Sequence, residues 1–150
     1  MDFNVKIVKS DSEKELVLNI RKDVFIRGLN IPEHLEIDET ENTATYVLAY
    51  TKNKPVGTAR WRKTKKGIKL ERFAVLDKYR SNGIGSKMTK FILNNLKETQ
   101  PIYLYAQVSA IKFYKRLGFK SIGNIFEQVG IKHQKMIYDL DGKKANVFPS

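Results

Sequence analysis

The sequence predicts a domain of the α+β (mixed α/β) class, built around a mixed sheet. Residues 43–76 contain three segments rich in β-branched and aromatic side chains, separated by short turns. Residues 83–97 then place apolar side chains at helical spacing, and two more strand-like segments follow residue 119. Short turns between successive strands favour an antiparallel meander, whereas the helices that follow require longer connections.

The first forty residues predict a strand, a helix and an irregular segment. Residues 3–8 alternate apolar and polar side chains, as a strand does. Ser10 or Asp11 can cap the helix that follows, which we expect to end near Gly28. Its apolar side chains recur at helical spacing, at Leu16, Ile20 and Val24. Residues 28–42 are irregular and acidic, and a short helix is expected between 30 and 36.

The remaining elements follow from the same two periodicities. We expect strands at 43–50, 56–62, 68–76, 101–107, 119–127 and 132–140, and helices at 83–97 and 109–117. The order is therefore β-α-β-β-β-α-β-α-β-β. There is no internal repeat and no linker, so we predict one domain over residues 1–150, with residues 141–150 as a loose tail.

Composition restricts the location and chemistry of the protein. No apolar run is long enough for a transmembrane helix, and the N-terminus lacks a secretory pattern, so we expect a cytoplasmic protein with no membrane partner. The chain has no cysteine, which excludes disulfides and thiolate chemistry. It has only two histidines, without ligand spacing, so no metal site is expected.

The net charge of +12 leaves two interpretations open. The lysines are scattered, which favours a solvated basic surface over a nucleic-acid interface. The densest cluster surrounds the turn at 65–67 and comprises Arg60, Arg62, Lys63, Lys65, Lys66 and Lys69. This cluster supports an alternative function as a basic nucleic-acid-binding module, although no recognition motif for DNA or RNA accompanies it.

A glycine-containing loop precedes the helix at 83–97. Its sequence is Arg80-Ser81-Asn82-Gly83-Ile84-Gly85. Glycine lets the backbone approach a ligand closely, and free amides at a helix start bind phosphate oxygens. The loop is neither a Walker P-loop nor a three-glycine dinucleotide fingerprint. By itself it is equally consistent with a simple tight turn.

Two separated motifs give the loop a context. The Arg-x-x-Gly-x-Gly loop, with the strand Leu70–Val75 before it, resembles the acetyl-CoA pyrophosphate loop of GNAT acetyltransferases. About thirty residues later, the segment from Ala106 to Phe119 resembles the second GNAT signature, Ala-x-x-Phe-Tyr-x-x-x-Gly-Phe. The resemblance extends from Val24 to Tyr138 and is closest to the ElaA-like branch. Gln107 stands where many GNAT proteins have Asn, but Gln is common in that branch.

The resemblance implies a fold, an activity and a co-substrate. The fold would be a mostly antiparallel sheet with a V-shaped gap between two parallel strands and helices on both faces. The activity would be acetyl-CoA-dependent N-acetyl transfer to a primary amine, an acyltransferase reaction of the EC 2.3.1 type. The residues implied in acetyl-CoA binding are Phe73, Ala74, Val75, Arg80, Ser81, Asn82, Gly83, Ile84, Gly85, Ser86, Gln107, Ala110 and Phe113.

Two catalytic roles are expected. Tyr114 occupies the tyrosine position of the family and would protonate the departing thiolate, unless it is only a core aromatic. Glu71, at a position where glucosamine-phosphate acetyltransferases carry a glutamate, is a candidate general base. It could equally be a surface carboxylate paired with a lysine, and a water chain could replace it. Alternation along the strand would place Glu71 and Arg72 on opposite faces.

Two residues are candidates for the acceptor site. His133 matches a histidine of the ElaA-like pattern, and histidine is a common proton acceptor in enzymes, but a lone histidine is often structural. Asp38 lies in the acidic segment between Glu33 and Glu41, which could attract a cationic amine or simply be solvated. His34 lies in the same segment and has less support.

The acceptor itself stays open at this point. Small-molecule and peptide amines are both compatible, and the family frequently forms homodimers. A tRNA-directed acetyltransferase would agree with both the family resemblance and the basic net charge. A third alternative is a degenerate member that binds acyl-CoA without catalysis, against which the intact loop and Tyr114 argue.

Overall fold

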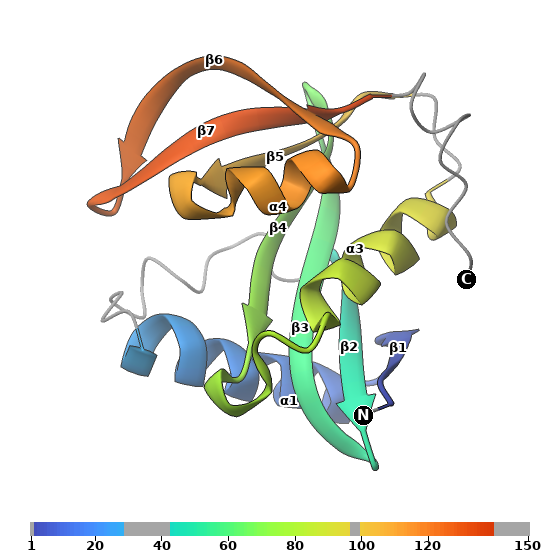
Figure 1. The fold of residues 1–150 in the computed structure, drawn as a ribbon. Helices are drawn as coiled ribbons and strands as arrows, with labels where there is room; N and C mark the ends of the chain where they lie inside the picture. The colour runs from blue at the N-terminus through green and yellow to red at the C-terminus, as the bar shows by residue number, and fades with distance from the viewer. Residues whose placement is uncertain (1, 29–42, 97–99, 140–150) are drawn as a thin grey trace.

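The computed structural model describes residues 2–28, 43–96 and 100–139 (Figure 1). Its strands form one seven-stranded sheet in the order β1-β2-β3-β4-β5-β7-β6. The strands are β1 (Asn4–Ile7), β2 (Thr45–Thr51), β3 (Lys54–Thr64), β4 (Gly67–Val75), β5 (Ile102–Gln107), β6 (Phe119–Gln128) and β7 (Ile131–Tyr138). Every pairing is antiparallel except that of β4 with β5.

The helices fall at the positions that the sequence predicts. They are α1 (Asp11–Arg21), which continues as the π-helix η1 (Lys22–Gly28), α3 (Ile84–Asn95) and α4 (Ile111–Arg116), with short 3₁₀ turns η3 (Asp77–Tyr79) and η4 (Val108–Ala110). The predicted order of strands and helices is therefore confirmed. The expected helix between residues 30 and 36 and the tail at 141–150 lie outside the described residues.

The first helix begins at a capping box. The hydroxyl of Ser10 accepts the Glu13 amide, and the Glu13 carboxylate accepts the Ser10 amide, at 3.2 Å in each case. These two bonds satisfy amides that have no partner within the helix. Of the two capping residues expected, the structure uses Ser10. Within the described parts of the chain, no helix is long and apolar enough to cross a membrane.

Apolar side chains form one core on each side of the sheet. On the α1 side, Val17, Ile20 and Val24 pack with Tyr46, Leu48 and Ala74. On the α3–α4 side, the buried stripe of α3 packs against the inward side chains of β3, β4 and β5, a set that includes Ile84, Met88, Ile92, Ile68, Leu70, Ile102 and Leu104. The predicted covering of both faces by helices is confirmed.

Strands β4 and β5 pair only where they begin. Ile68 lies opposite Ile102 and Lys69 opposite Tyr103, and no further pairs follow. The amide of Ile68 also donates to the Pro101 carbonyl at 2.8 Å, which fixes this junction. Beyond it the two strands diverge, as Figure 1 shows. The sheet therefore has the V-shaped gap that the resemblance implies.

Candidate active site

A cavity of about 620 Å³ lies where β4 and β5 diverge. Its walls include residues 69–75 of β4 and 104–107 of β5. Gly85, Met88, Phe113 and Tyr114 line it on the α3–α4 side, whereas Val24, Lys69 and Glu71 line it on the α1 side. The cavity therefore passes through the sheet, so that two ligands could meet in it from opposite faces.

A β-bulge at Arg72 controls what β4 presents to this cavity. Thr58 pairs with Ala74 and Arg60 with Glu71, so Arg72 and Phe73 together face one residue of β3. Arg72 has a φ of 57°, in the left-handed region. In a regular strand Glu71 and Phe73 would share a face. The bulge instead turns Glu71 to the α1 side and Phe73 to the α3–α4 side, so simple alternation does not hold at Arg72.

The glycine loop lies at the α3 end of the cavity. Gly83 is the N-cap of α3 with a φ of 79°, and a side chain built on it would meet no atom within 4 Å. No side chain caps the first amides of α3, and its first turn contains no acidic residue. Free amides and a positive helix end form a site suited to an anion.

Arg80 and Asn82 hold the loop in shape. The guanidinium of Arg80 donates to the Val75 carbonyl at 3.2 Å, which ties the loop to the end of β4. The amide of Asn82 donates to the carbonyls of Tyr79 and Arg80, at 3.1 and 3.0 Å. Arg80 itself is exposed and lines the cavity, while Ser81, Asn82 and Gly83 are exposed beside it. Ile84 is buried in the core, so only its backbone is available there.

Residues of the second motif close the same cavity. Gln107, Ala110 and Phe113 all line it. A side chain built on Gly85 would lie 3.4 Å from the Phe113 ring, so this glycine lets α3 and α4 approach closely. The structure thus brings the two sequence motifs to one place.

Tyr114 stands at the centre of an aromatic cluster. It is 8% exposed, and its ring lies 5.8 Å from those of Phe73 and Phe119 and 4.9 Å from that of Phe113. Burial raises the pKa of the Tyr114 hydroxyl well above its usual range. This hydroxyl therefore keeps its proton at neutral pH, and the same shift makes it a weaker proton donor than an ordinary tyrosine.

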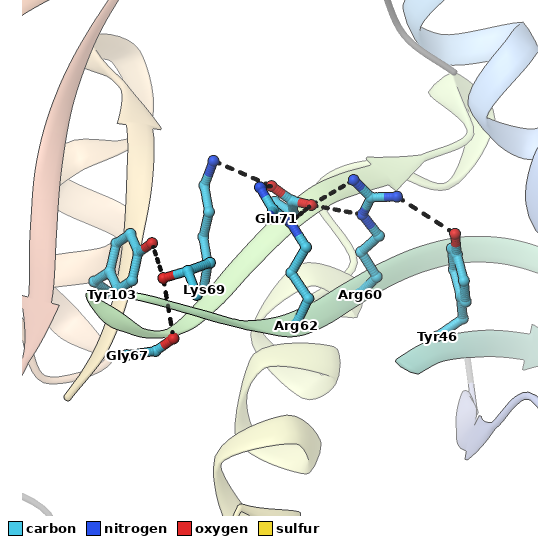
Figure 2. A network of polar contacts seen from close by, with 8 residues as sticks. Tyr46, Arg60, Arg62, Gly67, Lys69, Glu71 and Tyr103 are labelled. Atoms are coloured by element: carbon cyan, nitrogen blue, oxygen red, sulfur yellow. Dashed lines mark hydrogen bonds and ion pairs between the residues drawn. The ribbon is translucent and has the colours of Figure 1, made fainter. Parts of the chain in front are cut away.

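Glu71 is the centre of a buried ion-pair network (Figure 2). Its carboxylate accepts from the Nε atoms of Arg60 and Arg62, at 2.7 and 2.8 Å. The Lys69 ammonium lies 3.1 Å from its other oxygen. The Arg60 side chain is fully buried and also contacts the Tyr46 hydroxyl at 3.4 Å. Glu71 is therefore an interior carboxylate shared by three cations, and not a surface group paired with one lysine.

This environment bears on the expected role of Glu71. Burial alone would raise its pKa, but the hydrogen bond from Arg62 and the charges of Arg60 and Lys69 outweigh burial and lower the pKa to about 2. Such a carboxylate is a weak proton acceptor at neutral pH. Glu71 is therefore better suited to anchoring this network than to acting as a general base.

The network also accounts for half of the basic cluster seen in the sequence. Arg60, Arg62 and Lys69 all bind Glu71 instead of pointing into solvent. That leaves a smaller group of cations at the turn for a nucleic-acid partner. The nucleic-acid alternative stays a prediction from charge alone.

His133 lies on the α1 side of the gap, opposite Gln107 in the pairing of β5 with β7. It is half-buried and lines the cavity. Its Nδ1 atom lies 2.8 Å from the Ile131 carbonyl, which orients the ring. The structure thus places His133 within reach of a ligand. Asp38 and His34 lie outside the described residues.

Several cavity residues were not anticipated. Lys69 and Tyr105 line it on the α1 side, and Gln128, Val129 and Ile131 approach it from the β6–β7 hairpin. Lys69 lies two positions before Glu71, and Tyr105 two before Gln107, so strand alternation could have indicated both. Nothing in the sequence indicates that the hairpin reaches the gap. Among the described residues, no group of three or more acidic or histidine side chains could hold a metal.

Comparison with known proteins identifies the family. Residues 10–140 match the model of the acetyltransferase (GNAT) domain. The chain belongs to the GNAT acetyltransferase family. The N-acetyltransferase YjcF of Bacillus subtilis (strain 168) is 34% identical to this GNAT protein over 136 residues, which cover 89% of this chain and 97% of YjcF. The protein is thus an enzyme of the N-acetyltransferase class.

Solved structures show the same fold. Escherichia coli ElaA superposes on this GNAT chain with a TM-score of 0.81 at 23% identity, covering 93% of this chain and all of ElaA. An acyl-CoA N-acyltransferase from Pseudomonas aeruginosa superposes with a TM-score of 0.80 at 20% identity, and the match covers 92% of this chain and 99% of that enzyme. The similarity to ElaA agrees, at the level of the fold, with the branch that the sequence suggested.

Proposed function

We propose that this GNAT enzyme transfers an acetyl group from acetyl-CoA to a primary amine of an acceptor. The observation that carries the proposal is the cavity through the sheet, which joins the glycine loop and Tyr114 on one side to His133 and Tyr105 on the other. Acetyl-CoA would lie on the α3–α4 side, and the acceptor would enter from the α1 side. The amine nitrogen would bond to the thioester carbonyl carbon while the carbon–sulfur bond breaks.

The residues of the gap suit the shape of coenzyme A. Beyond Lys69, the edge of β4 that faces β5 has no strand partner among the described residues. The backbone of Phe73, Ala74 and Val75 can therefore pair with an extended pantetheine arm in the manner of an added strand. The backbone amides from Ser81 to Ser86, with Arg80 beside them, would hold the pyrophosphate. Ala110 and Phe113 would form the opposite wall, and Gln107, at the end of β5, would contact the arm from the α1 side.

Tyr114 would supply the proton that the departing thiolate needs. It lines the cavity, and its ring is held by contacts with Phe73 and Phe113. The acceptor amine must lose a proton, and water in the cavity can take it. His133 would contact the acceptor, and Asp38 stays a proposed acceptor contact from the sequence.

The test is a calorimetric titration of acetyl-CoA, with coenzyme A and ATP as comparison ligands. Wild type should bind both CoA species at micromolar concentration. Gly83→Asp should bind them at least about tenfold more weakly, because it puts a negative charge beside the pyrophosphate. Gly83→Asn is the matched control, since Asn and Asp are similar in size and both tolerate a positive φ.

Each outcome of the titration is informative. Binding that is lost in Gly83→Asp and kept in Gly83→Asn locates the pyrophosphate at the start of α3. Absence of binding at millimolar acetyl-CoA would contradict the proposal. Thiol release from acetyl-CoA with a panel of amines then measures transfer directly.

A further inference from the structure

An aromatic surface lies on the α1 side of the sheet and borders the gap. Tyr105, Phe126 and His133 come from three adjacent strands and form it, and we call it the aromatic shelf. The rings of Tyr105 and Phe126 meet edge to face at 5.3 Å, and those of Phe126 and His133 stack at 5.8 Å. Strand pairing places Phe126 opposite His133, which fixes this arrangement.

The shelf continues the cavity outward. His133 and Tyr105 line the cavity between β4 and β5. Tyr105 and Phe126 also line a second hollow of about 420 Å³, together with Ile122 and Lys135. Ile122 is 47% exposed, so its apolar surface is available to a ligand in this hollow. An apolar group of the acceptor could therefore lie on the shelf while its amine reaches the gap.

Two lysines stand over the tyrosines of β5. The Lys69 ammonium, from β4, lies 4.4 Å from the centre of the Tyr105 ring. The Lys135 ammonium, from β7, lies 5.0 Å from that of Tyr103. Lys69 thus lies beside the shelf at the cavity in the gap, and Lys135 lies beside it at the second hollow. Cation–π contacts orient an ammonium without neutralising its charge.

Among the residues that the structure describes, few carboxylates lie near these two lysines. The carboxylate that pairs with Lys69 is that of Glu71, which also pairs with Arg60 and Arg62. Lys135 makes no ion pair with a carboxylate of the described residues. Among those residues, Lys69 therefore shares its only carboxylate with two arginines and Lys135 has none, in a half-buried region where charges are screened less than at the surface. An anionic group on the ligand would restore the balance.

We propose that the acceptor is an amine that also carries a carboxylate next to an apolar or aromatic group, as in an apolar amino acid or a short peptide that ends in one. The inference rests on the proposed function and names its substrate class. The carboxylate binds Lys135 and Lys69, the apolar group lies on the aromatic shelf, and the amine points toward Tyr114. Polyamines, which the acidic segment around Asp38 would attract, are disfavoured by the same lysines.

The test compares ligands that differ only in the carboxylate. N-Acetylphenylalanine and its amide are titrated into the protein, with and without coenzyme A, so that the result does not depend on turnover. In parallel, phenylalanine, phenylalanine amide, a phenylalanine-ending dipeptide and spermidine are assayed for thiol release from acetyl-CoA. The variants are Lys135→Gln and, as matched control, Lys132→Gln, which removes the same charge from the opposite face of β7.

We expect the acid to bind about tenfold more tightly than the amide, a factor that corresponds to 1.4 kcal/mol. Lys135→Gln should abolish the difference between acid and amide and leave affinity for the amide unchanged. Lys132→Gln should retain the difference. Equal binding of acid and amide, an equal effect of both variants, or preferred acetylation of spermidine would overturn the proposal. Failure of acetyl-CoA to bind would instead remove the proposed function, and the titrations without coenzyme A would still decide whether the shelf selects acids.

Discussion

The ring of Tyr114, on α4, meets the ring of Phe73, on β4, edge to face at 5.8 Å. Both residues line the cavity between the diverging strands. Phe73 reaches this side of the sheet because the bulge at Arg72 reverses the alternation of β4. The position of the proposed acid therefore depends on a backbone irregularity in the strand that would bind the pantetheine arm.

Tyr114→Phe should lower kcat by a factor of about 10²–10⁴, the usual contribution of a general acid. The substitution keeps the ring that packs on Phe73, so the melting temperature and the Kd of acetyl-CoA should change little. Steady-state kinetics, thermal unfolding and calorimetry measure the three quantities. A larger change in Kd than in kcat would remove the acid role.

Tyr138→Phe is the matched control for that experiment. Tyr138 belongs to the same aromatic cluster, with its ring 5.2 Å from that of Phe119, but it does not line the cavity. Its buried hydroxyl has no hydrogen-bond partner among the described residues. Removing a buried hydroxyl without a partner relieves a desolvation cost, so activity should persist and stability should be equal or higher.

Glu71→Gln should destabilise the fold by about 3 kcal/mol, because it leaves buried Arg60 without its carboxylate partner. Urea denaturation followed by Trp61 fluorescence measures the loss. Glu127→Gln, at an exposed position of β6, is the control and should change stability little. Unchanged stability combined with a lost acidic limb in the pH–rate profile would show instead that Glu71 is a catalytic base.

The acid sensitivity of the fold should also depend on Glu71. Its pKa is about 2 in the folded protein, against an ordinary value of 4.5. A depressed carboxylate pKa contributes stability that is present above the unfolded pKa and is lost as the pH falls toward the folded pKa. Wild type should therefore lose stability between about pH 4.5 and pH 2. Urea midpoints across this range should fall less steeply in Glu71→Gln, and parallel curves would contradict the assignment.

The order of elements could be predicted because it depends on local periodicity. The alternation of β2, β3 and β4 and the apolar stripe of α3 are visible in single segments of sequence. The glycine loop and Tyr114 were also found locally, as motifs. These features need no knowledge of which strands are neighbours.

The parts of the site that the sequence could not predict depend on which strands pair and in which register. The network of Glu71 requires the register that places Arg60 opposite it, and the shelf requires β7 to lie between β5 and β6. The bulge has no local signal at all, since arginine has no preference for a positive φ. A match of position along the sequence cannot reveal the three cations around Glu71, which come from two paired strands.

Gly67→Ala tests what holds the two parallel strands together at the start of the gap. Gly67 has a φ of +130°, and an added Cβ would lie 2.2 Å from the Pro101 carbonyl oxygen. That oxygen accepts the Ile68 amide, so backbone atoms on both strands would have to move. The steric overlap and the strained φ together should lower the free energy of unfolding by about 3 kcal/mol or more.

Gly130→Ala separates the two contributions. Gly130 also has a positive φ, +74°, but an added Cβ there meets no atom within 4 Å, so only the backbone strain remains, about 1 kcal/mol. Urea denaturation of the two variants should therefore differ by about 2 kcal/mol. Acetyl-CoA affinity should fall in Gly67→Ala alone, because a displaced Pro101 changes the angle at which β5 leaves β4. If both variants lose the same free energy of unfolding, the backbone at Pro101 can move without an energetic cost. The junction then does not set the width of the gap.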